Sequence, residues 1–97
     1  MRSRGDKDND PLVFWLTGGP GCASELAVFF ENGPWKINDD LSLRKNPYSW
    51  NEHSNIVYID QPVGTGFSNI PSSSQGDYDT SEYQIAIDFY NFTLKFY

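Results

Sequence analysis

The residues best suited to chemistry form a glycine-rich turn between an apolar run and a helical pattern. This first glycine turn has the sequence TGGPG at residues 17–21, after the apolar run at 12–16 and before residues 24–30. Glycines lack a Cβ, so the backbone approaches a ligand closely, and successive N–H groups at a helix start stabilise negative charge. The turn therefore fits a phosphate cradle, an oxyanion hole or a tight structural turn.

The residues after the turn exclude one of these uses. A phosphate-binding P-loop ends in GK[ST], whereas this turn continues as CAS at residues 22–24, so a P-loop is excluded. An oxyanion hole stabilises the charge that develops on a carbonyl oxygen under attack. α/β-Hydrolases take one such donor from the loop after their third strand, and the order strand, glycine turn, helix fits that design. A structural turn remains the alternative.

A second glycine turn, GTG at residues 64–66, follows the apolar run at 55–60. It half-matches a dinucleotide-binding fingerprint, but Asn69 stands where the third glycine belongs and Pro62 interrupts the segment. Because a lone partial match of this kind is weak, the sequence predicts no nucleotide cofactor.

Two further candidates lack the partners that reactivity needs. His53, the only histidine, lies in a polar segment, and a general base needs a nucleophile and an orienting acid within reach. Cys22, the only cysteine, follows the glycines at a helix start, where the pKa of a thiol can fall. We expect a surface histidine and a structural cysteine.

Three aspartates, Glu31 and a glycosylation sequon each have a functional and a structural interpretation. Asp6, Asp8 and Asp10 are spaced like calcium ligands, but Pro11 replaces the required glycine, so no metal site is predicted. Glu31 ends the first helical pattern, where partial burial would raise a carboxyl pKa; an exposed helix end is the alternative. The glycosylation sequon that begins at Asn91 lies in a buried-looking helix, which favours a chance match.

Composition limits the classes of function. The 97 residues form at most one small domain, and seven basic against thirteen acidic residues give a net charge of −6. No basic stripe is present, so a nucleic-acid partner is not expected. No apolar run approaches the ~18 residues of a membrane span, a single cysteine excludes an internal disulfide framework, and the charged start predicts no signal peptide.

Strands and helices must alternate to position the two glycine turns. The apolar runs at 12–16 and 55–60 predict buried strands, and a helix over 24–30 ends at the sequence NGP. Residues 35–54 are expected to be turn-rich connecting structure. This order is an α/β pattern.

The rest of the chain completes this organisation. Residues 1–10 are polar and predict a flexible arm, followed by one folded part over residues 11–97. A loop at 71–79 precedes a capping box of Ser81 and Gln84, which begins a helix toward the chain end. This helix is apolar over most of its girth and needs burial on two sides. Two strands and two helices are too few for a sheet with both faces covered, so we expect the chain to be part of a larger domain.

Four segments together resemble the serine carboxypeptidase family, above all its plant members. They are WLTGGPGCAS at 15–24, FFENGP at 29–34, NPYSWN at 46–51 and DQPVGTGFS at 60–68. All four occur in family order with family-like spacing. The resemblance implies a partial α/β-hydrolase fold without a cofactor, and the release of C-terminal residues from peptides by a Ser-Asp-His triad. It also implies a secreted or vacuolar location.

The resemblance also implies roles for particular residues. It makes the Gly19 N–H the oxyanion donor, Phe30 part of the pocket for the leaving residue, and Cys22 one half of a disulfide whose partner this chain lacks. The family recognises the terminal carboxylate of its substrate at positions that correspond here to Trp15, Thr17, Gly18 and Glu31. Glu31 would share a proton with a second Glu beside the nucleophile, because two close carboxyls do not both ionise cheaply.

Two departures from the family pattern qualify the expected activity. Thr17 stands where many members carry Asn, and a Thr here also resembles plant acyltransferases that use the same triad. The chain contains no G-x-S-x-G segment, which is the usual setting of the nucleophile. We therefore expect a carboxypeptidase fragment that is inactive by itself. The alternatives are an acyltransferase fragment and a non-catalytic module that binds a peptide C-terminus.

Overall fold

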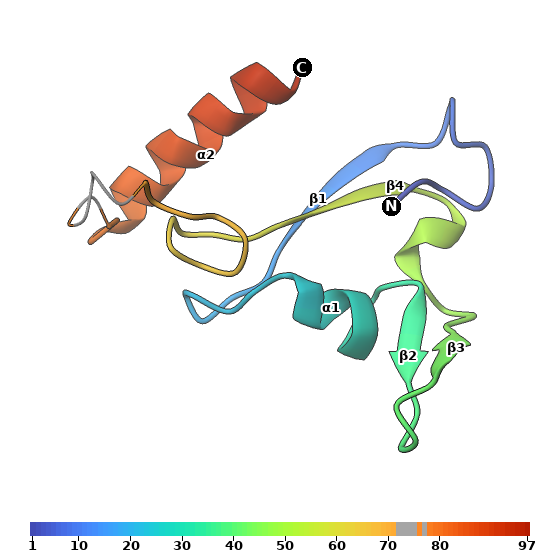
Figure 1. The fold of residues 1–97 in the computed structure, drawn as a ribbon. Helices are drawn as coiled ribbons and strands as arrows, with labels where there is room; N and C mark the ends of the chain where they lie inside the picture. Colours follow the sequence, from blue (N-terminus) through green and yellow to red (C-terminus); the bar gives the residue numbers. More distant parts are fainter. Residues whose placement is uncertain (72–75, 77) are drawn as a thin grey trace.

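The computed structural model in Figure 1 describes residues 1–71, 76 and 78–97. Its elements in chain order are β1 (Leu12–Leu16), α1 (Glu25–Phe30), β2 (Trp35–Ile37), β3 (Leu43–Lys45), a 3-10 turn (Trp50–Glu52), β4 (Asn55–Ile59) and α2 (Glu82–Phe96). The predicted loop at 71–79 falls partly outside the described residues, which omit its serine-rich stretch 72–75.

β1 and β4 form a two-stranded parallel sheet between the two helices. Their register runs from Leu12 opposite Asn55 to Leu16 opposite Ile59, so both predicted strands are confirmed. Each strand is a short apolar run, as expected for strands covered on both faces. Figure 1 shows α1 on one side of this sheet and α2 on the other. The described part of the chain is therefore a small α/β unit.

The α1 side of the sheet holds the small buried core. Ala27 and Val28 of α1 pack with Ile56 of β4, and all three are buried. The helix ends as predicted at NGP, where the Gly33 N–H donates to Ala27 O at 2.9 Å. A Cβ on Gly33 would lie 2.1 Å from Val28 O, so only glycine allows the chain to turn this tightly against the helix.

On the α2 side, aromatic rings join β1 to the last helix. Phe14 of β1 makes edge-to-face contacts with a cluster of rings on the last helix, namely Phe89, Phe92, Phe96 and Tyr97. No residue of α2 is buried, and Tyr83, Tyr90 and Leu94 are each more than half exposed. Of the two sides that the helix was expected to bury, the described residues cover one.

The predicted capping box is present at the beginning of α2 (Glu82–Phe96), but one of its two hydrogen bonds goes to a neighbouring residue. The Ser81 Oγ accepts a hydrogen bond from the Gln84 N–H at 3.4 Å. The Gln84 side chain returns a bond to the N–H of Thr80, at 2.8 Å, rather than to that of Ser81.

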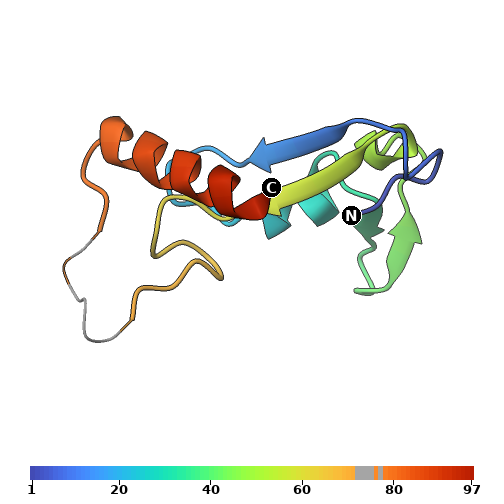
Figure 2. The same ribbon diagram turned by 90° about the horizontal axis from the view of Figure 1, so that it is seen from above.

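Residues 35–54 contain regular structure that the sequence did not reveal. β2 and β3 form an antiparallel hairpin, with Trp35 opposite Lys45 and Ile37 opposite Leu43. Each strand has three residues, and all of β3 is exposed, so the alternation that marks a strand has no room to develop. Seen from above, the hairpin and α2 lie toward opposite ends of the molecule (Figure 2).

Residues 1–10 also differ from expectation, because the predicted flexible arm is docked at its start. The Met1 amino group donates to Ile56 O at 2.6 Å, and the Ile56 N–H donates to Met1 O at 2.8 Å. The Arg4 N–H donates to Asn51 O at 2.7 Å. These partners are mostly main-chain groups. The polar composition of residues 1–10 therefore gave no sign that the segment would dock.

Candidate functional site

The two glycine turns lie side by side at one edge of the β1–β4 sheet. Each turn follows the carboxyl end of its strand, and parallel strands end at the same edge. A Cβ on Gly66 would lie 3.2 Å from the Cβ of Ala23, and a Cβ on Gly21 would lie 4.0 Å from Thr65 Oγ1. The second glycine turn is therefore packed directly against the first.

The first glycine turn presents its main chain beside a tryptophan. Trp15 Nε1 donates to Thr17 Oγ1 at 3.2 Å, which joins two of the predicted carboxylate-binding residues. Gly19 has φ +145°, a conformation that favours glycine, while a Cβ on Gly18 would meet no described atom within 4 Å. Neither the Gly18 nor the Gly19 N–H donates a hydrogen bond within the described chain. The main chain at both residues is thus accessible to a ligand.

Ser24 ties the first glycine turn to the ends of both strands. It is buried, and its Oγ accepts from the Thr17 N–H at 3.1 Å and donates to Ile59 O at 2.6 Å. Its own N–H donates to Asp60 Oδ1 at 2.5 Å. Ser24 occupies the N-cap position of α1, but its side chain does not cap the helix. Sequence reasoning missed this role because a serine at a helix start suggests a cap.

Asp60 is the second residue that sequence reasoning missed. Its Oδ2 accepts from the Phe67 N–H at 2.8 Å, and its backbone carbonyl accepts from Ser68 Oγ at 2.7 Å. Gly66 has φ +51°, and a Cβ there would lie 2.1 Å from Asp60 Oδ2. The glycines that suggested a nucleotide fingerprint instead let the chain wrap around this carboxylate.

Glu31 lies on the same side of the sheet as Trp15 but is not buried. Of the two possibilities left open by the sequence, the structure shows the exposed helix end, because Glu31 is exposed. Burial raises the pKa of Tyr58, and the negative charge of Glu31 raises it further. Tyr58 stands opposite Trp15 in the sheet register. Within the described residues, no hydrogen bond joins the Glu31 carboxylate to Trp15 or Thr17. Phe30 is 62% exposed.

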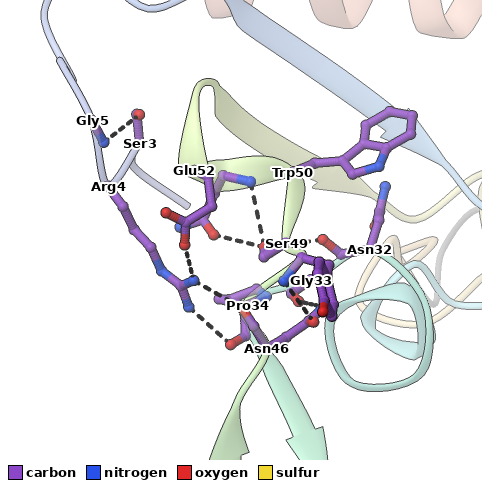
Figure 3. A network of polar contacts seen from close by, with 12 residues as sticks. Ser3, Arg4, Gly5, Asn32, Gly33, Pro34, Asn46, Ser49, Trp50 and Glu52 are labelled. Atoms are coloured by element: carbon purple, nitrogen blue, oxygen red, sulfur yellow. Dashed lines mark hydrogen bonds and ion pairs between the residues drawn. The ribbon is translucent and has the colours of Figure 1, made fainter.

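A buried polar network holds the segment that follows Glu31 (Figure 3). Asn32 O accepts from Ser49 Oγ and from the Trp50 N–H, both at 3.0 Å, and Asn46 Nδ2 donates to Gly33 O at 2.8 Å. The Trp50 ring packs edge-to-face on Trp15 at 5.1 Å. The NPYSWN segment, whose role the sequence did not indicate, thus positions both the chain after Glu31 and the Trp15 ring.

Arg4 closes the same network from the N-terminal segment. Its guanidinium donates to Pro34 O at 3.0 Å and to Asn46 O at 2.9 Å, and it forms an ion pair with Glu52. The hydrogen bond between Arg4 and Glu52 lowers the pKa of the Glu52 carboxyl from its usual value of 4.5. Arg4 therefore links the turn after α1 to the segment before β4.

The remaining candidates lie apart from one another. Cys22 is an exposed free thiol, and His53 is exposed. The described residues contain no cluster of potential ligands that would hold a metal ion, and none of their helices is long and apolar enough to cross a membrane. A groove of about 460 Å³ separates the first glycine turn from α2, and its walls include Gly18, Gly19, Pro20, Ile85 and Phe89.

The chain as a whole is similar to known proteins. The family model described as serine carboxypeptidase, peptidase family S10, matches residues 1–97. The chain belongs to the serine carboxypeptidase family. The resemblance found in the four sequence segments is thereby confirmed.

Individual serine carboxypeptidases match over nearly all of this chain. Serine carboxypeptidase-like 49 of Arabidopsis thaliana is 53% identical and serine carboxypeptidase 3 of Hordeum vulgare 52% identical, each over the whole chain and 18% of the relative. The solved structure of Kex1Δp, a prohormone-processing carboxypeptidase from Saccharomyces cerevisiae, matches 97% of this chain and 21% of its own, with 32% identity and a TM-score of 0.78. The chain spans about a fifth of the length of these serine carboxypeptidases.

Proposed function

We propose that this chain supplies the oxyanion donor and part of the substrate-carboxylate site of a serine carboxypeptidase, within a partial α/β-hydrolase fold. The observation that carries the proposal is the accessible main chain of Gly18 and Gly19 beside the Trp15–Thr17 hydrogen bond. The substrate is a peptide with a free C-terminus, and the reaction is removal of its last residue.

Each residue then has a defined task in acyl transfer. The Gly19 N–H stabilises the negative charge that develops on the scissile carbonyl oxygen. Trp15, Thr17, Gly18 and Glu31 form the region that meets the terminal carboxylate. Glu31 must be protonated, or share a proton, to donate to that carboxylate, because two carboxylates repel each other. The chain contains no G-x-S-x-G segment, so we expect these residues by themselves to catalyse no hydrolysis.

A chimeric enzyme tests the proposal. Residues 1–97 replace the matching segment of the Hordeum vulgare relative, which supplies the remainder of the domain. The substrates are an N-blocked Phe-Leu dipeptide and its C-terminal amide. We expect the chimera to release leucine from the free acid, and we expect the 97-residue chain by itself to release none. A folded chimera without activity would contradict the proposal, as would hydrolysis by the chain alone.

Glu31→Ala in the chimera tests carboxylate recognition separately from the chemical step. Alanine removes the hydrogen-bond donor, whereas the amide of a glutamine would keep one. We expect the KM of the acid substrate to rise about tenfold or more while that of the amide substrate changes little, because a lost charge-assisted hydrogen bond costs ~1.5–3 kcal/mol. Glu25→Ala, at the other end of α1, is the matched control and should leave both KM values unchanged. Equal effects on the acid and the amide would contradict the assigned role.

The alternative is a transferase that passes the acyl group to an alcohol instead of water, and Thr17 is the observation that favours it. Thr17→Asn introduces the residue common in the peptidases. If the site is that of a peptidase, hydrolysis by the chimera should be retained or increased. Transfer to an added alcohol that exceeds hydrolysis, and that the Asn variant abolishes, would favour the transferase. We further propose a secreted or vacuolar location, which fractionation of the source cells tests.

A further inference from the structure

Asp60 and the second glycine turn have no task in the chemistry described above, yet hydrogen bonds and backbone conformation constrain them closely. The Asp60 carboxylate accepts two main-chain hydrogen bonds, one on each oxygen, from Ser24 and Phe67. Gly66 and Gly64 both have positive φ, and glycine is the residue that tolerates this conformation. A turn with such constraints needs a reason beyond connecting β4 to the next segment.

The contacts lead from Asp60 to the first glycine turn in two steps. Asp60 fixes the main chain of Ser24 through its N–H, and the Ser24 hydroxyl fixes the Thr17 N–H at 3.1 Å. Thr17 immediately precedes Gly18 and Gly19. Ser24 is 1% exposed, so the hydroxyl works away from water, where a hydrogen bond is electrostatically stronger.

We infer that Asp60, acting through Ser24, is a positioning residue for the Gly18–Gly19 main chain. This inference rests on the proposed function, because it gives Asp60 a part in placing the oxyanion donor. A preorganised donor contributes only if it lies at hydrogen-bonding distance from the developing charge. A misplacement of about 1 Å can cost on the order of a hundredfold in rate.

Asp60→Asn is the primary test because it preserves the shape of the side chain. The N–H groups of Ser24 and Phe67 bind different oxygens of the carboxylate. The amide replaces one of these oxygens with a donor NH₂ group, which would face one of the two N–H groups. In the chimera we expect kcat to fall about tenfold or more while KM stays within about twofold. Asp40→Asn is the matched control, because Asp40 also accepts from a main-chain N–H, that of Ser42, but in the exposed β2–β3 turn.

A second pair of variants serves if Asp60→Asn prevents folding. Gly66→Ala would drive a Cβ to 2.1 Å from Asp60 Oδ2, whereas Gly64→Ala in the same turn would meet only the flexible side chain of Tyr78. Both residues have positive φ, +51° at Gly66 and +91° at Gly64, so alanine strains the backbone more at Gly64, the control position. We expect Gly66→Ala alone to lower kcat. Equal kcat values for the two alanine variants would overturn the inference.

Amide exchange in the 97-residue chain separates this inference from the proposed function. Asp60→Asn should speed hydrogen exchange at Thr17 and change the amide chemical shifts of Gly18 and Gly19, and Asp40→Asn should do neither. If these signals do not move, the positioning role fails even when the chimera is active. If they move but the unsubstituted chimera is inactive, the proposed function fails instead. A kcat loss shared by Asp60→Asn and Asp40→Asn would also reject the positioning role.

Discussion

The two faces of the β1–β4 sheet are covered in different ways. On the α1 face, buried polar side chains such as Asn46 and Ser49 hold main-chain carbonyls by directed hydrogen bonds, beside a small core of three apolar residues. On the α2 face, Phe14 meets a row of rings, and α2 contributes no buried residue. Directed bonds fix a geometry, whereas ring contacts tolerate sliding. The residues proposed to recognise substrate accordingly belong to the first face and its edge.

Gly33→Ala should have the largest effect, because it attacks the α1 face at its tightest point. The added Cβ would lie 2.1 Å from Val28 O and 2.3 Å from Val28 Cα, and neither backbone atom can move without displacing α1. We expect a loss of more than about 4 kcal/mol in the free energy of unfolding, measured by urea denaturation of the 97-residue chain. Gly18→Ala meets no described atom within 4 Å and should change this free energy little. Similar losses for both variants would remove the basis of the comparison.

Phe14→Ala should loosen the other face selectively. Truncation of a packed phenylalanine costs about 3 kcal/mol, and here it removes every ring contact between β1 and α2. We expect hydrogen exchange, followed by mass spectrometry, to accelerate throughout α2 and to stay slow in α1. Tyr83→Ala, at a 75% exposed position, is the control and should leave both helices unchanged. Equal acceleration of α1 and α2 would mean that the two faces unfold together.

Ser49→Ala should weaken the α1 face by an intermediate amount. The Ser49 hydroxyl lies 3.0 Å from Asn32 O and 2.7 Å from Asn51 Oδ1, and all three residues are buried. In the variant, Asn32 O keeps the hydrogen bond from the Trp50 N–H, but the buried Asn51 Oδ1 loses the Ser49 hydroxyl as its donor. Leaving a buried acceptor without a donor costs about 1–3 kcal/mol. Urea denaturation should report this loss, and Ser42→Ala in the exposed β2–β3 turn should cost less. The reverse order would contradict the importance of the buried network.

The smallest effect should be a pH dependence carried by Glu52. Because the hydrogen bond from Arg4 lowers the pKa of Glu52 in the folded chain, its stabilisation is complete above the unfolded value of about 4.5 and is lost as pH falls through the lower folded value. The midpoint of thermal unfolding should thus decrease below pH 4.5 more steeply in the unsubstituted chain than in Glu52→Gln. Parallel pH profiles would show that the ion pair contributes nothing.

The sequence predicted the elements that have strong local signals. The runs at 12–16 and 55–60 are continuous and apolar, and the capping residues of α2 mark its beginning, so these elements were found within a residue or so. The β2–β3 hairpin was missed because its strands are short and exposed, and Leu41 turns with φ 66° without a glycine to mark the place. The docking of Arg4 was missed because main-chain carbonyls leave no trace in a sequence.

Some features of the candidate site could also be predicted from the sequence, and others could not. Spacing placed Gly19 after a strand and before a helix, and family resemblance assigned Trp15 and Thr17 to one site, where a hydrogen bond does join them. Neither could show that the Ser24 N–H donates to Asp60, because that contact spans 36 positions of the chain. For Glu31, the apolar neighbours Phe29 and Phe30 left both partial burial and an exposed helix end open, and the structure shows the exposed end. Periodicity does not tell how far a six-residue helix extends past its sheet.

The long span between Ser24 and Asp60 has a consequence for synthesis on the ribosome. Chains grow at about 5–20 residues per second, so Asp60 follows Ser24 by about two to seven seconds. During that interval β1 lacks its pairing with β4, and the first glycine turn lacks the contacts of Ser24 with Ile59 and Asp60. The α1 helix and the β2–β3 hairpin rely on nearer partners and can form first. The edge of β1 that later pairs with β4 therefore waits for seconds in the nascent chain, a natural point for a chaperone to bind.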